Sequence, residues 1–320
     1  MAPWLREHHQ EFDCFVLHGL WQYHTYGAWR ILHPAGRPYF LFPHGMLDPW
    51  FRRAYPLRHL KKSLYWPWAE GRVARDAERV LFTSEEERRT ARGTFFPYRA
   101  REAIVPLGIA PPPPVTAADR EAFLARFPEA RNRRLFLFLG RLHSKKGCDL
   151  LIEAFAQVHA RTPDVVLMMA GPTTPWAEEL KRRTAALAPA FPILWPGMLA
   201  GALKWTALAS AELFLLPSHQ ENFGIAVVEA LAMGTPVVIS DRVHIWREIE
   251  SDRAGLACRN TAASLADALR KWEALPSDEK KEMGARARAA FLQRYQIDQS
   301  ALRLRAVLAP SSTEPSGALA

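Results

Sequence analysis

Two glutamates stand eight residues apart, in contrasting surroundings, in the segment HQENFGIAVVEALAMG at residues 219–234. Glu221 lies in a polar loop, whereas Glu229 lies inside the apolar run 225–234, which predicts a helix that ends at a glycine. A carboxylate among so many apolar side chains is costly without hydrogen-bond partners, so a purely structural Glu229 is the weaker interpretation. Glu221 could instead be a charge favoured by the helix dipole. Gly224 lets the backbone approach a ligand, and the first helical amides have no partner within the helix.

Two cations stand in a second loop, GRLHSKKGCD at residues 140–149, which follows the apolar run RLFLFLG. Arg141 offers a planar fork to phosphate oxygens and Lys146 a mobile point charge, and a helix is expected to begin directly after them. Cations beside a helix N-terminus are typical of a diphosphate site. The spacing alone also fits two solvated cations on a loop.

The elements that must position these loops alternate between strand and helix. Apolar runs predict strands at 134–140, 164–171, 191–197, 212–218 and 236–240, and helical spacing predicts helices at 148–161, 176–187, 201–209 and 225–234. Such alternation predicts a parallel sheet covered on both faces, a Rossmann-like domain, with ligands beyond the carboxyl ends of its strands. The loops 140–149, 171–176 and 219–224 all follow such strand ends.

The first half of the chain alternates in the same way. Its four strand-like runs lie at 13–19, 38–45, 78–84 and 102–108, and the proline run 111–114 reads as a stiff interdomain linker. We therefore expect an α/β protein of two Rossmann-like domains that face a cleft. The expected parts are a first domain at 1–114, a second domain at 115–290, a C-terminal helix at 291–309 that could cross back to the first domain, and a disordered tail at 310–320.

Composition indicates where the protein works and which kinds of partner it can bind. The formal net charge is +9, which favours an anionic partner, but the cations are scattered and no nucleic-acid-binding signature occurs, so we expect no nucleic acid. No apolar run approaches the roughly 20 residues that span a bilayer, and the start lacks the layout of a secretory signal. The three cysteines are far apart, without metal-ligand spacing, so a cytoplasmic location fits best.

The two loops together resemble the family-four retaining glycosyltransferases, which have the GT-B fold and are also called glycosyl transferases group 1. The resemblance is carried by the two glutamates around NFG, by FLGRLHSKKGCDLLIEAF at 138–155 and by LFLLPSHQENFGIAVVEALAMGTPVVISD at 213–241. In the first half, VLHGLWQY, PHGMLDPW, KKSLYW and FTSEEE are similar to a bacterial branch that works largely on surface polysaccharides. One departure is VPLGI at 105–109, where the family usually has Asn before the Gly.

The resemblance implies a role for each site residue. Glu229 would accept hydrogen bonds from the nucleotide ribose, and Glu221 would hold hydroxyls of the transferred sugar. Arg141 and Lys146 would stabilise the charge on the departing diphosphate. The remaining donor contacts would come from the backbone at Gly140, Asn222, Phe223 and Gly224.

On the acceptor side, the resemblance implies that His44 of PHGM contacts the sugar near the reacting carbon, and His18 of LHGLW is a weaker candidate. A lone histidine after a strand is usually structural, which is the alternative for both. No protein nucleophile is expected, because a donor phosphate oxygen would deprotonate the acceptor on one face of the sugar. No metal and no cofactor are expected, which agrees with the lack of any Asp-x-Asp pair.

The implied partners are a nucleotide-diphosphate-sugar donor and a glycan or polyprenyl-linked acceptor. Tryptophans crowd the first domain, and Arg58, Lys61 and Lys62 lie among them. Aromatic rings interleaved with cations suit peripheral contact with a membrane that carries the acceptor, although packing in the core is the simpler explanation for the rings.

Three further interpretations stay open. The chain could be a degenerate, non-catalytic protein that still binds a nucleotide sugar, or another GT-B enzyme such as a sugar phosphorylase or an epimerase. No lysine motif for the pyridoxal phosphate of a phosphorylase is visible.

The segment DCFVLHGLW resembles a strand from the middle of a GT-B first domain, so we expect an N-terminally truncated, incomplete first domain without its opening strands and Gly-rich loop.

Overall fold

The computed structural model describes residues 1–159, 162–187 and 192–309, which form two compact units. The first unit comprises Met1–Gly108 and the described residues from Asp298 onward, and the second comprises Ile109–Ile297. The observed division follows Gly108, whereas we expected it after residue 114. Ile109 forms a β-bridge with Gln296 and therefore belongs with the second unit. The expected disordered tail lies outside the described residues.

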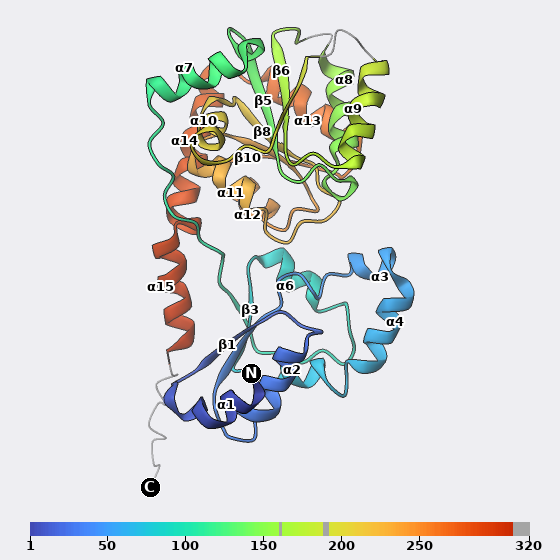
Figure 1. Ribbon diagram of the computed structural model, residues 1–320, viewed down its shortest axis with the longest axis vertical. Helices are drawn as coiled ribbons and strands as arrows, with labels where there is room; N and C mark the ends of the chain where they lie inside the picture. The colour runs from blue at the N-terminus through green and yellow to red at the C-terminus, as the bar shows by residue number, and fades with distance from the viewer. Residues whose placement is uncertain (160–161, 188–191, 310–320) are drawn as a thin grey trace. The chain divides into compact units, whose positions relative to one another are not determined.

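The first unit is built on a parallel sheet in the order β1-β2-β3-β4 (Figure 1). The strands are β1 (Phe15–His18), β2 (Tyr39–Phe42), β3 (Arg79–Phe82) and β4 (Glu102–Ile104). The fourth strand was expected to reach residue 108. It ends early, after the amide of Val105 donates to the carbonyl of Phe82, because Pro106 has no N–H to continue the ladder.

Helices cover both faces of this sheet. They are α1 (Ala2–His8), α2 (Tyr23–Leu32), α3 (Trp50–Ala54), α4 (Pro56–Tyr65), α5 (Glu70–Asp76), α6 (Glu85–Ala91) and α15 (Ile297–Leu308), with a 3₁₀ turn at His9–Glu11. Side chains alternate between the faces of a strand. Leu41 packs into a core with Trp66 and Val73, whereas Phe40 and Phe42 form a second core that Leu304, Val307 and Leu308 of α15 cover.

A helix precedes the first strand. No helix was predicted before the strand-like run at 13–19, but α1 comes first and buries Leu5 in the core beside α2. A proline in its first turn favours this helix, because proline presets φ where no N–H bond is lost.

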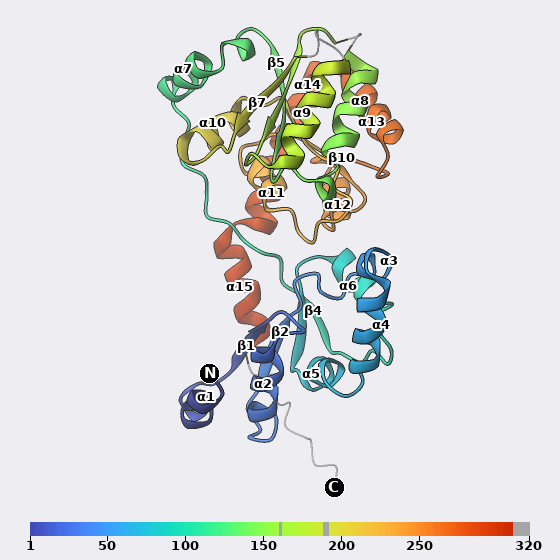
Figure 2. The same ribbon diagram turned by 45° about the vertical axis from the view of Figure 1, so that its right-hand side comes forward.

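The second unit has a six-stranded parallel sheet in the order β10-β9-β8-β5-β6-β7 (Figure 2). The strands are β5 (Arg134–Leu139), β6 (Val165–Ala170), β7 (Ile193–Gly197), β8 (Leu213–Leu216), β9 (Val237–Ser240) and β10 (Gly255–Cys258). Every residue of β6, β8 and β9 is buried, as expected for parallel strands covered on both faces. The chain runs outward from β5 to β7 and then outward in the other direction from β8 to β10. The order therefore reverses between β5 and β8, and ligands of doubly wound sheets bind at such a point.

Helices pack on both sides of the second sheet, so that α8 contacts α13 while α11 contacts α14 and α10 (Figures 1 and 2). They are α7 (Ala117–Arg126), α8 (Cys148–His159), α9 (Pro175–Leu187), α10 (Gly201–Ser210), α11 (Ile225–Ala232), α12 (Trp246–Ser251), α13 (Ala262–Ala274) and α14 (Ser277–Ala290). Short 3₁₀ turns occur at Pro128–Ala130 and Ser144–Lys146, and a π-helical turn at Phe291–Tyr295 joins α14 to α15. The expected helix at 291–309 is thus a π-helical turn followed by α15.

Candidate active site

The loop after β5 is held against the end of β8 by a close backbone approach. Gly147 has φ +65°, and a Cβ there would lie 2.0 Å from the carbonyl oxygen of Pro217. The amide of His219 also donates to the carbonyl of Lys145 at 2.9 Å. The two loops at the reversal of strand order, 140–147 and 217–224, therefore form one surface.

Lys146 and Glu221, predicted separately from these two loops, form an ion pair. Both side chains are largely buried, and the backbone of Glu221 is fixed by hydrogen bonds with Arg242 and His244. Burial, together with the charges of Lys145 and Arg141, lowers the pKa of Lys146 to about 8. With this pKa the ammonium keeps its proton at neutral pH, and Glu221 is its counter-ion.

Arg141 extends from the same loop and is exposed. Its charge acts on Lys146, so two cations meet beside the start of α8. Gly140 lies at the base of the loop, where its amide donates to the carbonyl of Ala170 at 3.0 Å. A Cβ on Gly171 would lie 2.0 Å from the Gly140 carbonyl oxygen, so the turns after β5 and β6 are also in contact.

The segment 222–224 presents backbone at the start of α11. Gly224 has φ +84°, a conformation that glycine adopts without strain, and it is the N-cap of α11. The Phe223 side chain is buried and packs edge-on against Tyr295. Phe223 can therefore offer a ligand its amide but not its ring. Asn222 is half-buried beside them.

Glu229 lies within α11 itself, and it has a partner that we did not predict. Lys204 of α10 donates to Glu229 Oε1 at 2.8 Å, and both side chains are mostly buried. The Lys204 ammonium also lies 4.2 Å from the centroid of the Trp205 ring. The costly carboxylate in the apolar helix is thus neutralised, and Lys204 is an additional cation next to the predicted ribose ligand.

His18 and His44 meet in the first unit, at the carboxyl ends of β1 and β2. His18 Nδ1 and His44 Nε2 are 2.8 Å apart, and both rings stack on Phe42. Burial lowers the pKa of each ring; the charge of His24 lowers the pKa of His18 further, and that of His18 lowers the pKa of His44 further. The pair is therefore uncharged at neutral pH and shares one hydrogen bond.

The backbone at His44 is strained, because a non-glycine residue there has φ +48°. Glu87, a buried carboxylate of α6, holds the adjoining turn. It accepts hydrogen bonds from the Gly45 amide at 2.6 Å, the Thr83 amide at 2.7 Å and the Thr83 hydroxyl at 2.6 Å. Glu87 is thus a positioning residue for the histidine pair, and neither its position nor its role was predicted from the sequence.

We expect Glu87→Ala to lower the free energy of unfolding by about 3 kcal/mol or more, since each buried donor left unpaired costs about 1–3 kcal/mol. Glu86→Ala, on the same helix but only half-buried, should cost less than about 1 kcal/mol. Urea unfolding of both variants measures the difference. Equal urea midpoints for the two variants would show that Glu87 does not hold this turn in place.

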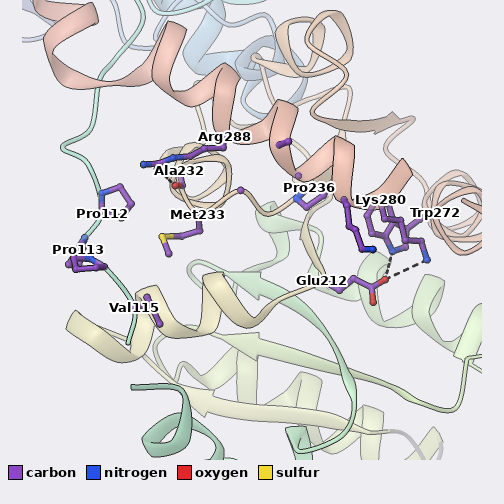
Figure 3. A pocket seen from close by; sticks show the side chains of 15 residues that line it. Pro112, Pro113, Val115, Glu212, Ala232, Met233, Pro236, Trp272, Lys280 and Arg288 are labelled. Atoms are coloured by element: carbon purple, nitrogen blue, oxygen red, sulfur yellow. Dashed lines mark hydrogen bonds and ion pairs between the residues drawn. The ribbon is translucent and has the colours of Figure 1, made fainter. Parts of the chain in front are cut away.

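A hollow of about 820 Å³ opens elsewhere in the second unit, at the amino ends of β8 and β9. Figure 3 shows Glu212 bonded there to Trp272 and Lys280, at 2.9 Å and 3.7 Å. Arg134 also donates two hydrogen bonds to Glu212. The charged groups around Glu212 thus pair with one another. The hollow lies at the amino ends of the strands, at the edge of the sheet opposite the loops of Lys146 and Glu221. We therefore assign the hollow no part in the candidate site.

Among residues 1–159, 162–187 and 192–309, no three or more His, Cys, Asp or Glu side chains gather as a metal site would require. Within the same residues, no helix is both long and apolar enough to cross a bilayer.

Two Rossmann-like units, each with a parallel sheet, place the protein in the GT-B fold class. The chain belongs to the glycosyl transferases group 1 family, whose model matches residues 119–290, and a glycosyl transferase 4-like domain matches residues 1–108. Among solved structures, Anabaena HepE in complex with UDP and glucose superimposes with a TM-score of 0.76 at 18% identity, over 96% of this chain and 80% of that one. Sucrose-phosphate synthase from Thermosynechococcus elongatus superimposes with a TM-score of 0.73 at 20% identity, over 96% of this chain and 76% of that one.

Curated relatives are similar over shorter parts of their length. A GDP-mannose-dependent alpha-(1-6)-phosphatidylinositol dimannoside mannosyltransferase of Mycobacterium tuberculosis is 28% identical over 275 residues, which are 83% of this chain and 66% of the relative. Mannosylfructose-phosphate synthase of Agrobacterium fabrum is 32% identical over 150 residues, 45% of this chain and 33% of the relative. The chain thus spans between a third and two thirds of these two relatives.

Proposed function

We propose that the protein transfers a hexosyl unit from a nucleoside-diphosphate sugar to a hydroxyl of a glycan or a lipid-linked acceptor, with retention of anomeric configuration. The observation that carries this proposal is the ion pair of Lys146 and Glu221 at the reversal of strand order, beside the start of α11. It places a cation for the diphosphate and a carboxylate for sugar hydroxyls on one surface. Glu229, with Lys204 beside it, is the proposed ribose ligand.

In the proposed reaction the bond from the anomeric carbon to the diphosphate oxygen breaks, and a bond to the acceptor oxygen forms on the same face. The acceptor proton passes to a phosphate oxygen of the leaving group. Arg141, Lys146 and the amides at the start of α11 stabilise the charge that grows there, in a site where few dipoles must reorganise. These groups make a metal ion unnecessary, and no cofactor is required.

The neutral histidine pair is the proposed acceptor-side element. An imidazole that is uncharged at neutral pH can donate one hydrogen bond to a sugar hydroxyl without binding the anionic leaving group. His44 is the proposed contact near the reacting carbon, and His18 orients it through their hydrogen bond.

The proposed partners follow the same chemistry. One relative is a GDP-mannose-dependent mannosyltransferase of phosphatidylinositol dimannoside, and the structure of HepE holds UDP and glucose, which supports a nucleotide-sugar donor and a glycolipid or glycan acceptor. Surface polysaccharide synthesis is the proposed setting. We propose a cytoplasmic reaction with peripheral membrane contact, and the three free cysteines fit a reducing compartment.

A donor screen tests the function. UDP- and GDP-hexoses are incubated with the protein, with and without acceptor glycans, and release of nucleoside diphosphate and the anomeric form of the product are followed by NMR. We expect one donor to be preferred, the product to keep the donor configuration, and chelation by EDTA to leave the rate within about twofold. Donor binding without transfer, inversion, or strict dependence on Mg²⁺ or Mn²⁺ would each contradict the proposal.

A further inference from the structure

Helix α4 exposes an apolar stripe that no described part of the chain covers. None of its ten residues is buried. Leu57, Leu60 and Leu64 recur at the spacing of a single helix face, and their exposed fractions are 82%, 58% and 69%. Trp68 follows one turn later and is 70% exposed. A run of large apolar side chains facing solvent marks an interaction surface.

The opposite face of α4 is the one that packs on the first unit. The His59 ring stacks on Phe95 with centroids 4.8 Å apart, and Trp66, directly after the helix, is fully buried. The helix is therefore anchored by one side, and the leucines point away from the core. In both ribbon views α4 lies on the far side of the first unit from β1 (Figures 1 and 2).

The segment that carries the stripe has only positively charged side chains. Residues 49–69 contain no aspartate or glutamate but five cations, namely Arg52, Arg53, Arg58, Lys61 and Lys62. Arg58 and Lys62 lie over the rings of Tyr55 and Trp21, and within the described residues none of the five forms an ion pair. Within the described residues, the one opposing charge that acts on these side chains is that of Glu70, on Lys62.

A hollow of about 480 Å³ adjoins the cationic side of α4. Its walls are largely aromatic, with Trp21, Tyr23, Tyr26 and Tyr65, and Arg58, Lys61 and Lys62 also line it. Its one acid, Glu70, is buried, and burial raises the pKa of this carboxyl to about 7, so at neutral pH it carries about half a negative charge against the three cations. Tyrosine and tryptophan beside lysine and arginine are the side chains that favour the region of lipid headgroups.

Other occupants fit these observations less well. A second copy of the chain would bring five like charges against five, and a helix about 15 Å long offers too little area for a stable dimer. A protein partner would have to be both apolar and acidic over a short stripe. An anionic bilayer accounts for both the apolar stripe and the positive charge, because the leucines can pack among acyl chains while the cations pair with lipid phosphates.

We propose that α4, with Trp68, is an interfacial helix that docks the first unit onto an anionic lipid bilayer. Leu57, Leu60 and Leu64 enter the boundary of the acyl chains, and Arg58, Lys61 and Lys62 meet lipid phosphates at the mouth of the aromatic hollow. The inference rests on the peripheral membrane contact of the proposed function and names the surface that makes it. It uses no residue of the donor site and stands whichever sugar is transferred.

Co-sedimentation of the full chain with vesicles tests this docking. Vesicles of phosphatidylcholine alone are compared with vesicles in which a third of the lipid is phosphatidylglycerol. We expect binding about tenfold tighter to the anionic vesicles, weakening as salt is raised. Absence of binding to anionic vesicles, or equal binding to both kinds, would overturn the proposal.

Matched variants locate the surface. Leu60→Ser should weaken binding severalfold, and the triple change Leu57→Ser, Leu60→Ser, Leu64→Ser should abolish it. Leu302→Ser on α15, where the leucine is 57% exposed, is the control and should bind normally. Replacing Arg58, Lys61 and Lys62 by glutamine should weaken binding about tenfold, whereas the same charge removed at Arg182, Lys271 and Lys281 should not.

Because the substituted leucines are exposed, unfolding midpoints should stay unchanged, which separates docking from misfolding. Nucleoside-diphosphate affinity should also be unchanged in these variants. Vesicle binding that persists in the α4 variants, or that falls equally in the controls, would place the contact elsewhere and overturn the proposal. A dimer that is lost in the leucine triple variant would show that a second copy covers the stripe, and would overturn it too.

Discussion

Lys146→Met should weaken nucleoside-diphosphate binding about 10- to 150-fold, because a hydrogen bond to a charged group contributes about 1.5–3 kcal/mol. Lys145→Met should bind within about threefold of the unmodified chain, since the Lys145 side chain acts on Lys146 through its charge and the substitution keeps the backbone bond to His219. Calorimetry with UDP and GDP measures both variants. The two lysines are neighbours in one turn, so the comparison separates the position of the ammonium from the net charge of the loop.

The same lysine predicts how donor affinity depends on pH. Its pKa in the unliganded protein is lowered to about 8, so its charge is present below that pH and is lost as the pH rises through it. A diphosphate binds the charged form, and affinity should therefore be flat up to about pH 7.5 and then fall by up to about tenfold per pH unit. Lys146→Arg keeps its charge throughout and should abolish this fall, even if its affinity is lower. A wild-type profile that stays flat to about pH 9.5 would contradict the assignment of Lys146.

Much of this site could be predicted from the sequence because its residues lie in short segments with their own local pattern. Lys146 and Glu221 each follow an apolar strand, and parallel strands bring their carboxyl ends to one edge of a sheet. The pairing of the two loops depends on the reversal of order between β5 and β8, and that order is set by packing of the whole sheet. The resemblance implied that both residues belong to one donor site, but the ion pair between them was not predicted.

Lys204 shows what local pattern cannot reveal. It lies 25 residues before Glu229 on an ordinary-looking helix, and only the packing of α10 against α11 brings the two together. Glu87 is a similar case. Three glutamates follow one another in the sequence, and only the packing of α6 decides which of them is buried against the turn at Gly45. The contact of His18 with His44 likewise requires β1 and β2 to be neighbours, which alternation alone does not state.

The fold was predicted where apolar residues form an uninterrupted run. The strands β5, β6 and β9 were each placed within two residues of their observed bounds. The strand β10, of sequence GLAC, was missed because it is short and only partly buried. The helix α1 was missed because its single buried leucine leaves no periodic pattern to read.

Gly147→Ala should be the most damaging single-methyl change in the donor loop. The new Cβ would lie 2.0 Å from the Pro217 carbonyl oxygen, and φ at +65° is a conformation that costs alanine about 1–2 kcal/mol by itself. Neither the loop after β5 nor that after β8 can keep its place, so the pair of Lys146 and Glu221 should separate. We expect the free energy of unfolding to fall by about 3 kcal/mol or more, combining backbone strain with overpacking.

Gly201→Ala is the matched control, since Gly201 in the same unit has φ +55° but nothing within 4 Å of the added Cβ. It should show the cost of the backbone conformation alone, about 1–2 kcal/mol, and retain nucleoside-diphosphate binding. Gly147→Asn adds a further comparison, because asparagine tolerates a left-handed φ yet carries the same Cβ, so it should not rescue the loop. Urea unfolding and calorimetry measure all three variants. If Gly147→Ala and Gly201→Ala lose equal stability and both bind the diphosphate, then the close approach of the two loops is not what builds the donor site.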